Sequence, residues 1–84
     1  MLAACDNDLL GEIFRQGKLK LEVKREFYGG NLTTVATAIN LLQDVDMANL
    51  VGPKLVKAAI TAGLVDPNAV IRIGGVPHVQ LVKL

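Results

Sequence analysis

Paired glycines, a proline and the chain's single histidine fall within residues 71–80. Gly74 and Gly75 allow a tight turn or the close approach of a ligand to the backbone. Pro77 stiffens the exit from such a turn, and His78 can donate, accept or titrate near neutral pH. The pattern predicts either a small anionic-ligand site around His78 or a structural turn in which the histidine is hydrogen-bonded locally.

Metal and cofactor chemistry are not expected from these residues. One histidine and the single cysteine, Cys5, do not supply metal-ligand spacing, and Gly74-Gly75 lacks the GxGxxG spacing and following helix of a dinucleotide site. Cys5 is expected to be a small buried hydrophobe. No nucleophile-base or paired-carboxylate arrangement can be argued from spacing, so a non-enzymatic role is favoured.

A second pattern is a cluster of cations, because five of the nine basic residues fall within eleven positions, interrupted by the single acid Glu22. Alternation puts the lysines of residues 18–24 on one face of a predicted strand, where they could follow the phosphates of a nucleic acid. Exposed Phe27 or Tyr28 would add stacking on an unpaired base, worth about 1–3 kcal/mol. The alternative, favoured by a net charge of only +1, is a solvated strand face whose lysines prevent edge-to-edge association. The clustered cations are Arg15, Lys18, Lys20, Lys24 and Arg25.

A third candidate is the predicted helix start at Gly52-Pro53, which Lys54 follows. Unpaired N–H groups at a helix start can hold a phosphate or a carboxylate. Because proline removes one of these donors, an ordinary structural cap is the alternative.

Composition bounds the fold that must position these residues. Hydrophobic residues make up 51% of the 84-residue chain and charged residues 20%, which is typical of a globular domain. We expect a single α+β domain over residues 1–84, with a radius of gyration of about 12 Å. No apolar run approaches the roughly 20 residues of a membrane span, and one cysteine forms no internal disulfide, so a cytoplasmic protein without a membrane partner is expected.

Hydrophobic periodicity predicts a mixed sheet with three helices in the order β-α-β-α-β-α-β-β, ending in a β-hairpin. The first helix is predicted after an Asp6 N-cap, since Leu9, Leu10, Ile13 and Phe14 share a helical face. The predicted strands are residues 2–5, 18–24, 44–51, 69–73 and 78–84, the predicted helices are 7–16, 33–43 and 54–62, and residues 26–31 and 74–77 are predicted to connect them.

Several sequence phrases occur together in this chain: FYGG at residues 27–30, ANLVG at 48–52 and IRIGGVPHVQ at 71–80. With them, nearly the whole chain resembles the archaeal family called domain of unknown function 424. The resemblance implies a non-enzymatic, RNA-binding protein linked to translation or to ribosome-related factors. It points to Phe27, Tyr28, Gly29, Gly30, Asn49, Gly52, Arg72, Gly74, Gly75, Pro77, His78 and Gln80.

Charge clustering and resemblance together predict an RNA-binding protein, accessory to translation or ribosome assembly, with RNA and a translation or ribosome-related protein as partners. Tyr28 and His78 are expected to contact bases or riboses. Two alternatives stay open: a protein-interaction module that docks on a larger partner, and the anionic-ligand site around His78. The predicted phosphate contacts are Arg15, Lys18, Lys20, Lys24, Arg25 and Arg72.

Overall fold

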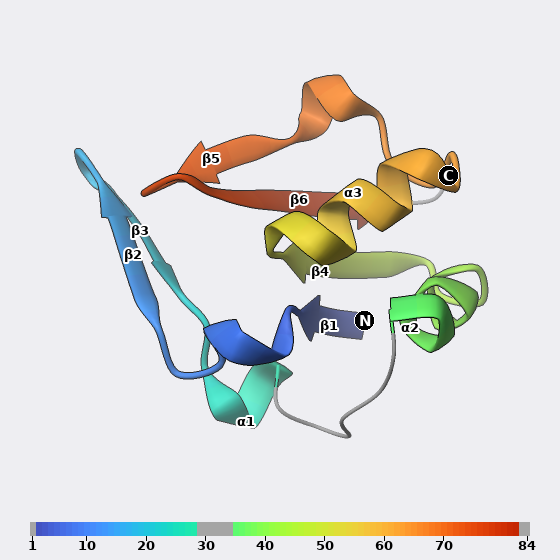
Figure 1. Ribbon diagram of the computed structural model, residues 1–84, viewed down its shortest axis with the longest axis horizontal. Helices are drawn as coiled ribbons and strands as arrows, with labels where there is room; N and C mark the ends of the chain where they lie inside the picture. The colour runs from blue at the N-terminus through green and yellow to red at the C-terminus, as the bar shows by residue number, and fades with distance from the viewer. Residues whose placement is uncertain (1, 29–34, 83–84) are drawn as a thin grey trace.

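The computed structural model describes residues 2–28 and 35–82, with the side chains of residues 26 and 27 outside this description. A four-stranded sheet, a separate two-stranded hairpin and two longer helices make up this part of the chain (Figure 1). Its elements are β1 (Leu2–Cys5), η1 (Asn7–Leu9), β2 (Ile13–Gln16), β3 (Leu19–Glu22), α1 (Arg25–Tyr28), α2 (Val35–Leu42), β4 (Met47–Val51), α3 (Pro53–Thr61), η2 (Pro67–Ala69), β5 (Ile71–Ile73) and β6 (Val76–Val82).

The four-stranded sheet has the order β1-β4-β6-β5 and is mixed. β1 runs parallel to β4, whereas β4 with β6 and β5 with β6 are antiparallel. The radius of gyration of 11.9 Å agrees with the value expected from chain length. The predicted small α+β domain with a mixed sheet is therefore confirmed at this level of detail.

The predicted helix over residues 7–16 is wrong. Residues 7–9 form one 3-10 turn, and β2 follows and pairs with β3, with Phe14 opposite Leu21. The pairing continues past the strands, because Gly11 N–H donates to the Val23 carbonyl at 2.8 Å and Val23 N–H to the Glu12 carbonyl at 3.0 Å. Ladder bonds between distant residues thus replace the local bonds of a helix. Two helices of at least two turns, α2 and α3, are present in the described residues instead of three; α1 is a single turn.

The other predicted strands and helices are present, with unchanged bounds for β1, shifted bounds for α3 and β6 and shorter bounds for β3, β4 and β5, while the single-turn α1 occupies the first part of the connection predicted over residues 26–31. The C-terminal hairpin is confirmed with a tighter connection than expected. β5 ends at Ile73 and β6 begins at Val76, so two residues connect the strands instead of four. Gly74 and Gly75 have φ of 59° and 82°, the left-handed pair required by a type I′ turn. The predicted start of α2, at residues 33–34, lies outside the described residues.

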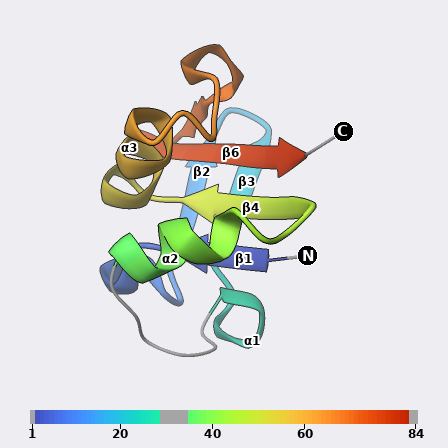
Figure 2. The ribbon, with the colours of Figure 1, turned by 90° about the vertical axis from the view of Figure 1, so that its right-hand side faces the viewer.

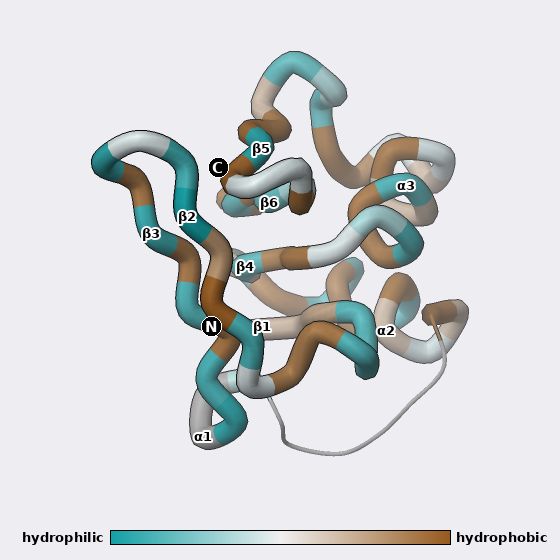
Figure 3. The backbone as a smooth tube through the Cα atoms, turned by 60° about the vertical axis from the view of Figure 1, so that its left-hand side comes forward, coloured by the Kyte–Doolittle hydropathy of each residue, from teal (hydrophilic) through white to brown (hydrophobic). Residues whose placement is uncertain are grey.

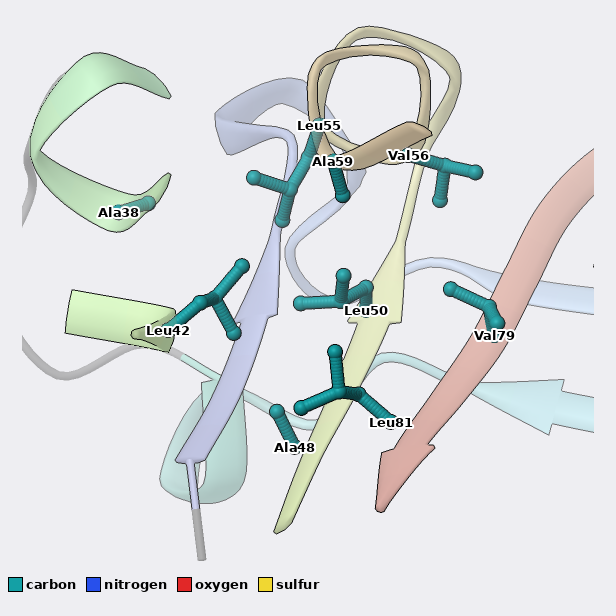
Figure 4. Close-up of a cluster of buried hydrophobic side chains, with 9 residues drawn as sticks. All are labelled: Ala38, Leu42, Ala48, Leu50, Leu55, Val56, Ala59, Val79 and Leu81. Carbon is teal, nitrogen blue, oxygen red and sulfur yellow. The ribbon is translucent and has the colours of Figure 1, made fainter. Parts of the chain in front are cut away.

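Register divides the sheet into two faces, because directly paired residues point the same way. One face carries Ala48 and Leu50 of β4 beside Leu81 and Val79 of β6. We call it the helix face, because α2 and α3 lie on that side (Figure 2). Figure 4 shows the side chains that meet there. The buried cluster consists of Ala38, Leu42, Ala48, Leu50, Leu55, Val56, Ala59, Val79 and Leu81.

The opposite face, which we call the hairpin face, is covered at one end by β2 and β3. The hairpin stands across the ends of β1, β4 and β5 (Figure 1). Leu21 and Val23 of this segment form a second buried cluster with Val51 and Ile73. The other end of the face is exposed, with Met47 at 40% and Val82 at 54%. No helix within the described residues is long and apolar enough to cross a membrane.

Candidate functional site

The hairpin itself carries the clustered cations, and its register sorts its side chains onto two sides. Arg15 lies directly opposite Lys20, while Phe14 lies opposite Leu21. Since Phe14 and Leu21 belong to the buried cluster beneath the hairpin, Arg15 and Lys20 point to the other side, away from the core. Figure 3 shows the alternation of hydrophilic and hydrophobic residues along β3. We call this outward side the cation face.

The cation face is exposed and carries more positive than negative charge. Lys18 lies in the hairpin turn and Lys24 follows the ladder, both exposed like Arg15 and Lys20. One acid shares the face, since the Lys20 Nζ lies 3.9 Å from the Glu22 Oε1. With side chains 47% and 41% exposed, this ion pair contributes at most about 1 kcal/mol and leaves Lys20 available to a stronger anion.

Arg25 and Arg72 are placed differently from the hairpin cations. The guanidinium of Arg25 lies against the backbone at Gly11, where a Cβ would come 3.3 Å from the Nε. Arg72 of β5 pairs with Pro77 of β6, and this register puts the Arg72 side chain on the helix face of the sheet. The structure therefore brings Arg15, Lys18, Lys20 and Lys24 onto one hairpin and separates Arg72 from them.

The start of α3 is occupied by a side chain of this chain. Asp6, 7% exposed, follows β1, and its carboxylate accepts from Lys54 N–H at 3.0 Å and from Leu55 N–H at 2.9 Å. Gly52 makes room for it, since a Cβ there would come 2.5 Å from the Asp6 Cγ and φ is 115°. Two N–H groups that could have bound a phosphate thus donate to the Asp6 carboxylate instead. The start of α3 is therefore an ordinary structural cap.

His78 lies on the hairpin face of β6, in register with Val51 and Ile71. Its Nδ1 is buried without a hydrogen-bond partner among the described residues, and burial lowers the pKa of the imidazole below its ordinary value of 6.5. Asn49 and Gln80 are paired one row further along the same face. His78, Asn49 and Gln80 are therefore neighbours on one sheet face, on the far side of the hairpin from Arg15 and Lys20.

Tyr28 and Cys5 lie together under the base of the hairpin. Both pack against the second buried cluster. Burial, with a smaller contribution from Cys5, raises the pKa of the Tyr28 hydroxyl. Burial, followed by the carboxylates of Asp6 and Asp8, raises the pKa of the Cys5 thiol. Cys5 is thus a protonated, partly buried thiol, and Tyr28 is turned toward the core and not toward the cation face.

The remaining motif residues serve turns and packing where the structure describes them. The buried Pro77 accepts a hydrogen bond at its carbonyl from Gly52 N–H at 2.9 Å. Gly74 packs under the hairpin, where a Cβ would come 3.2 Å from the Arg15 carbonyl oxygen, and its N–H donates to the Gln16 Oε1 at 3.1 Å. Gly29, Gly30 and the side chain of residue 27 lie outside the description.

Two residues that the sequence patterns do not place at a site, Asp6 and Gln16, make side-chain hydrogen bonds between distant segments. The sequence predicts Asp6 as the cap of the helix that follows it, and no local pattern links this residue to Gly52-Pro53, 46 residues later. No pattern in the sequence predicts the contact of Gln16 with Gly74. No cluster of three or more metal-ligating side chains occurs among the described residues.

The fold and this surface define a small α+β domain with a cationic hairpin on a mixed sheet. The family model described as "Protein of unknown function (DUF424)" matches residues 1–84, so the chain belongs to that family, which confirms the resemblance seen in the sequence. A solved structure, "Crystal structure of an uncharacterized conserved protein from Methanopyrus kandleri", is similar with a TM-score of 0.72 and 26% identity. The match covers 96% of this chain and 81% of that one. No curated protein matches the chain.

Proposed function

We propose that this protein binds RNA through the cation face of the β2–β3 hairpin, in an accessory role in translation or ribosome assembly. The observation that carries the proposal is the direct pairing of Arg15 with Lys20 across the hairpin. Like charges directly opposite each other destabilise an antiparallel pair. Phosphates bound to these two side chains would relieve that repulsion.

The surrounding charge supports the same function. Residues 12–25 contain five cations against two carboxylates, Glu12 and Glu22, whereas the whole chain carries only +1. Four of these five cations, all except Arg25, lie on the hairpin, so the positive charge is concentrated there and is offset elsewhere. Since phosphate neutralisation supplies most of the sequence-independent affinity for nucleic acids, a local excess of this kind is what such binding requires.

Fluorescence anisotropy with a labelled, structured RNA over a series of salt concentrations tests the proposal. About three to five phosphate contacts predict a slope of log affinity against log salt of roughly −2 to −4. The double variant Arg15→Gln, Lys20→Gln should reduce the steepness of that slope by about 2, because each lost phosphate contact contributes about 1.

The matched control is Lys54→Gln, Lys57→Gln, which removes two exposed charges from α3 and should leave the slope within about 0.5 of the wild-type value. The proposal fails if affinity ignores salt, if no binding is seen below about 100 μM at low salt, or if both double variants lose affinity equally. Crosslinking in the native cells, followed by sequencing of attached RNA, would name the RNA species.

A protein-interaction module is the second candidate, favoured by the exposed end of the hairpin face. Met47 and Val82 form a cross-strand pair there, 40% and 54% exposed. A partner that docks on this face would co-purify after nuclease treatment and would be lost on Val82→Lys. Retention of such a partner by that variant would remove this candidate.

A further inference from the structure

We infer that the RNA is double-helical and that the hairpin lies across its narrow major groove, contacting phosphates of both strands. This inference rests on the proposed function and names the substrate class for the same surface. It follows from how the cations are arranged on two strands and from where the aromatic rings of the described residues point.

The cations of the hairpin form a compact cluster and not a single row. Arg15 and Lys20 lie on adjacent strands, so their Cβ atoms are about 5 Å apart across the hairpin. Lys18 extends the cluster at the turn. An A-form RNA helix has a deep, narrow major groove, and side chains cannot enter it to contact the bases. At the two edges of that groove, the phosphates of the two strands lie close together. Paired cations on neighbouring strands suit two facing phosphate rows better than one extended chain.

The aromatic side chains that the structure describes are turned away from this cluster. Proteins that bind single strands gain about 1–3 kcal/mol for each base stacked on an aromatic ring. Two of the three aromatic side chains in the sequence, Phe14 and Tyr28, pack against the buried cluster beneath the hairpin. Within the paired strands, the other side chains on the cation face are Ile13 and Glu22. The cation face therefore contacts the phosphate backbone and does not select among bases.

Anisotropy with three labelled probes tests the inference: an RNA duplex of about 16 base pairs, one strand composed to remain unpaired, and a DNA duplex of the same sequence. The RNA duplex should bind about tenfold more tightly than the single strand, because fewer phosphates of a single strand reach the cluster. A second RNA duplex of scrambled sequence should bind equally. Arg15→Gln, Lys20→Gln should weaken binding to both RNA duplexes alike.

The outcomes separate this inference from the function on which it rests. Equal or tighter binding to the single strand, or to the DNA duplex, overturns the inference while leaving salt-dependent nucleic-acid binding in place. Loss of affinity in Phe27→Ala with single-strand preference also overturns it, because it would show a stacking contact. Failure of all probes to bind overturns the proposed function itself.

Discussion

Removal of the Asp6 carboxylate is the sharpest test of how this fold is held together. Asp6 is 7% exposed, and its carboxylate joins the end of β1 to the start of α3 through two hydrogen bonds of 3.0 and 2.9 Å. Hydrogen bonds to a charged group contribute about 1.5–3 kcal/mol each. Allowing for partial rehydration of Lys54 N–H, Asp6→Ala should lower the free energy of unfolding by about 3–5 kcal/mol.

That loss is a large fraction of the whole, since an 84-residue domain is stable by about 4–13 kcal/mol. Urea unfolding followed by circular dichroism measures it, and the melting temperature should fall by at least about 12 °C. Asp6→Asn keeps one acceptor and should lose about 1–3 kcal/mol. The matched control is Asp66→Ala, because that exposed carboxylate accepts one local bond from Asn68 N–H at 2.9 Å and should cost about 1 kcal/mol.

Gly52 supplies a second arm of the same experiment. Gly52→Ala places a Cβ 2.5 Å from the Asp6 Cγ and forces a φ of 115° on a residue with a side chain. In the Asp6→Ala background the steric conflict disappears and the backbone strain remains, so the two substitutions should be non-additive. The reasoning is refuted if Asp6→Ala costs no more than Asp66→Ala, or if the cycle is additive within about 0.5 kcal/mol.

Other predictions concern the hairpin contact and the two titratable groups with shifted pKa. Gly74→Ala should lower the free energy of unfolding by at least about 1 kcal/mol more than Gly17→Ala does. Both glycines have a φ of 59°, but a Cβ at Gly74 would lie 3.2 Å from the Arg15 carbonyl oxygen, whereas one at Gly17 would meet nothing within 4 Å. Equal losses in urea unfolding would contradict this prediction. Burial lowers the pKa of His78 below 6.5, so the unfolded chain takes up the proton first as pH falls. The contribution of the neutral histidine to stability is therefore complete above about pH 6.5 and is lost as pH falls. His78→Gln should flatten the fall in melting temperature between about pH 7 and 5, and an unchanged profile would contradict this prediction. Burial and two nearby carboxylates raise the pKa of the Cys5 thiol, so alkylation by iodoacetamide at about pH 8 should be slower in the folded protein than in urea, and equal rates would show an accessible thiolate.

Local patterns predicted most of the strands and two of the helices correctly. The run of alternating residues 18–24 gave a strand with Leu21 and Val23 buried, and Pro53 marked the start of α3. These features follow from nearest neighbours along the chain, where periodicity and proline geometry act directly. Leu19 departs from the pattern at 54% exposed, because it lies at the tip of the hairpin beside the turn.

The helix predicted over residues 7–16 shows where local patterns fail. Leu9, Leu10, Ile13 and Phe14 satisfy a helical face, yet Phe14 is buried by pairing β2 with β3 and docking the hairpin on the sheet. A hydrophobic side chain gains the same burial from either structure, so the choice depends on partners elsewhere in the chain.

The sequence by itself determined the composition of the core, the cluster of cations and the glycine turn, because each is a property of neighbouring residues. Tertiary structure alone decided that Arg15 lies beside Lys20 on the outward side of the hairpin, that Arg72 lies apart from them, and that Asp6 caps a helix 48 residues away. Those outcomes depend on strand register and long-range hydrogen bonds, and one residue of register reverses the face that every side chain of a strand occupies.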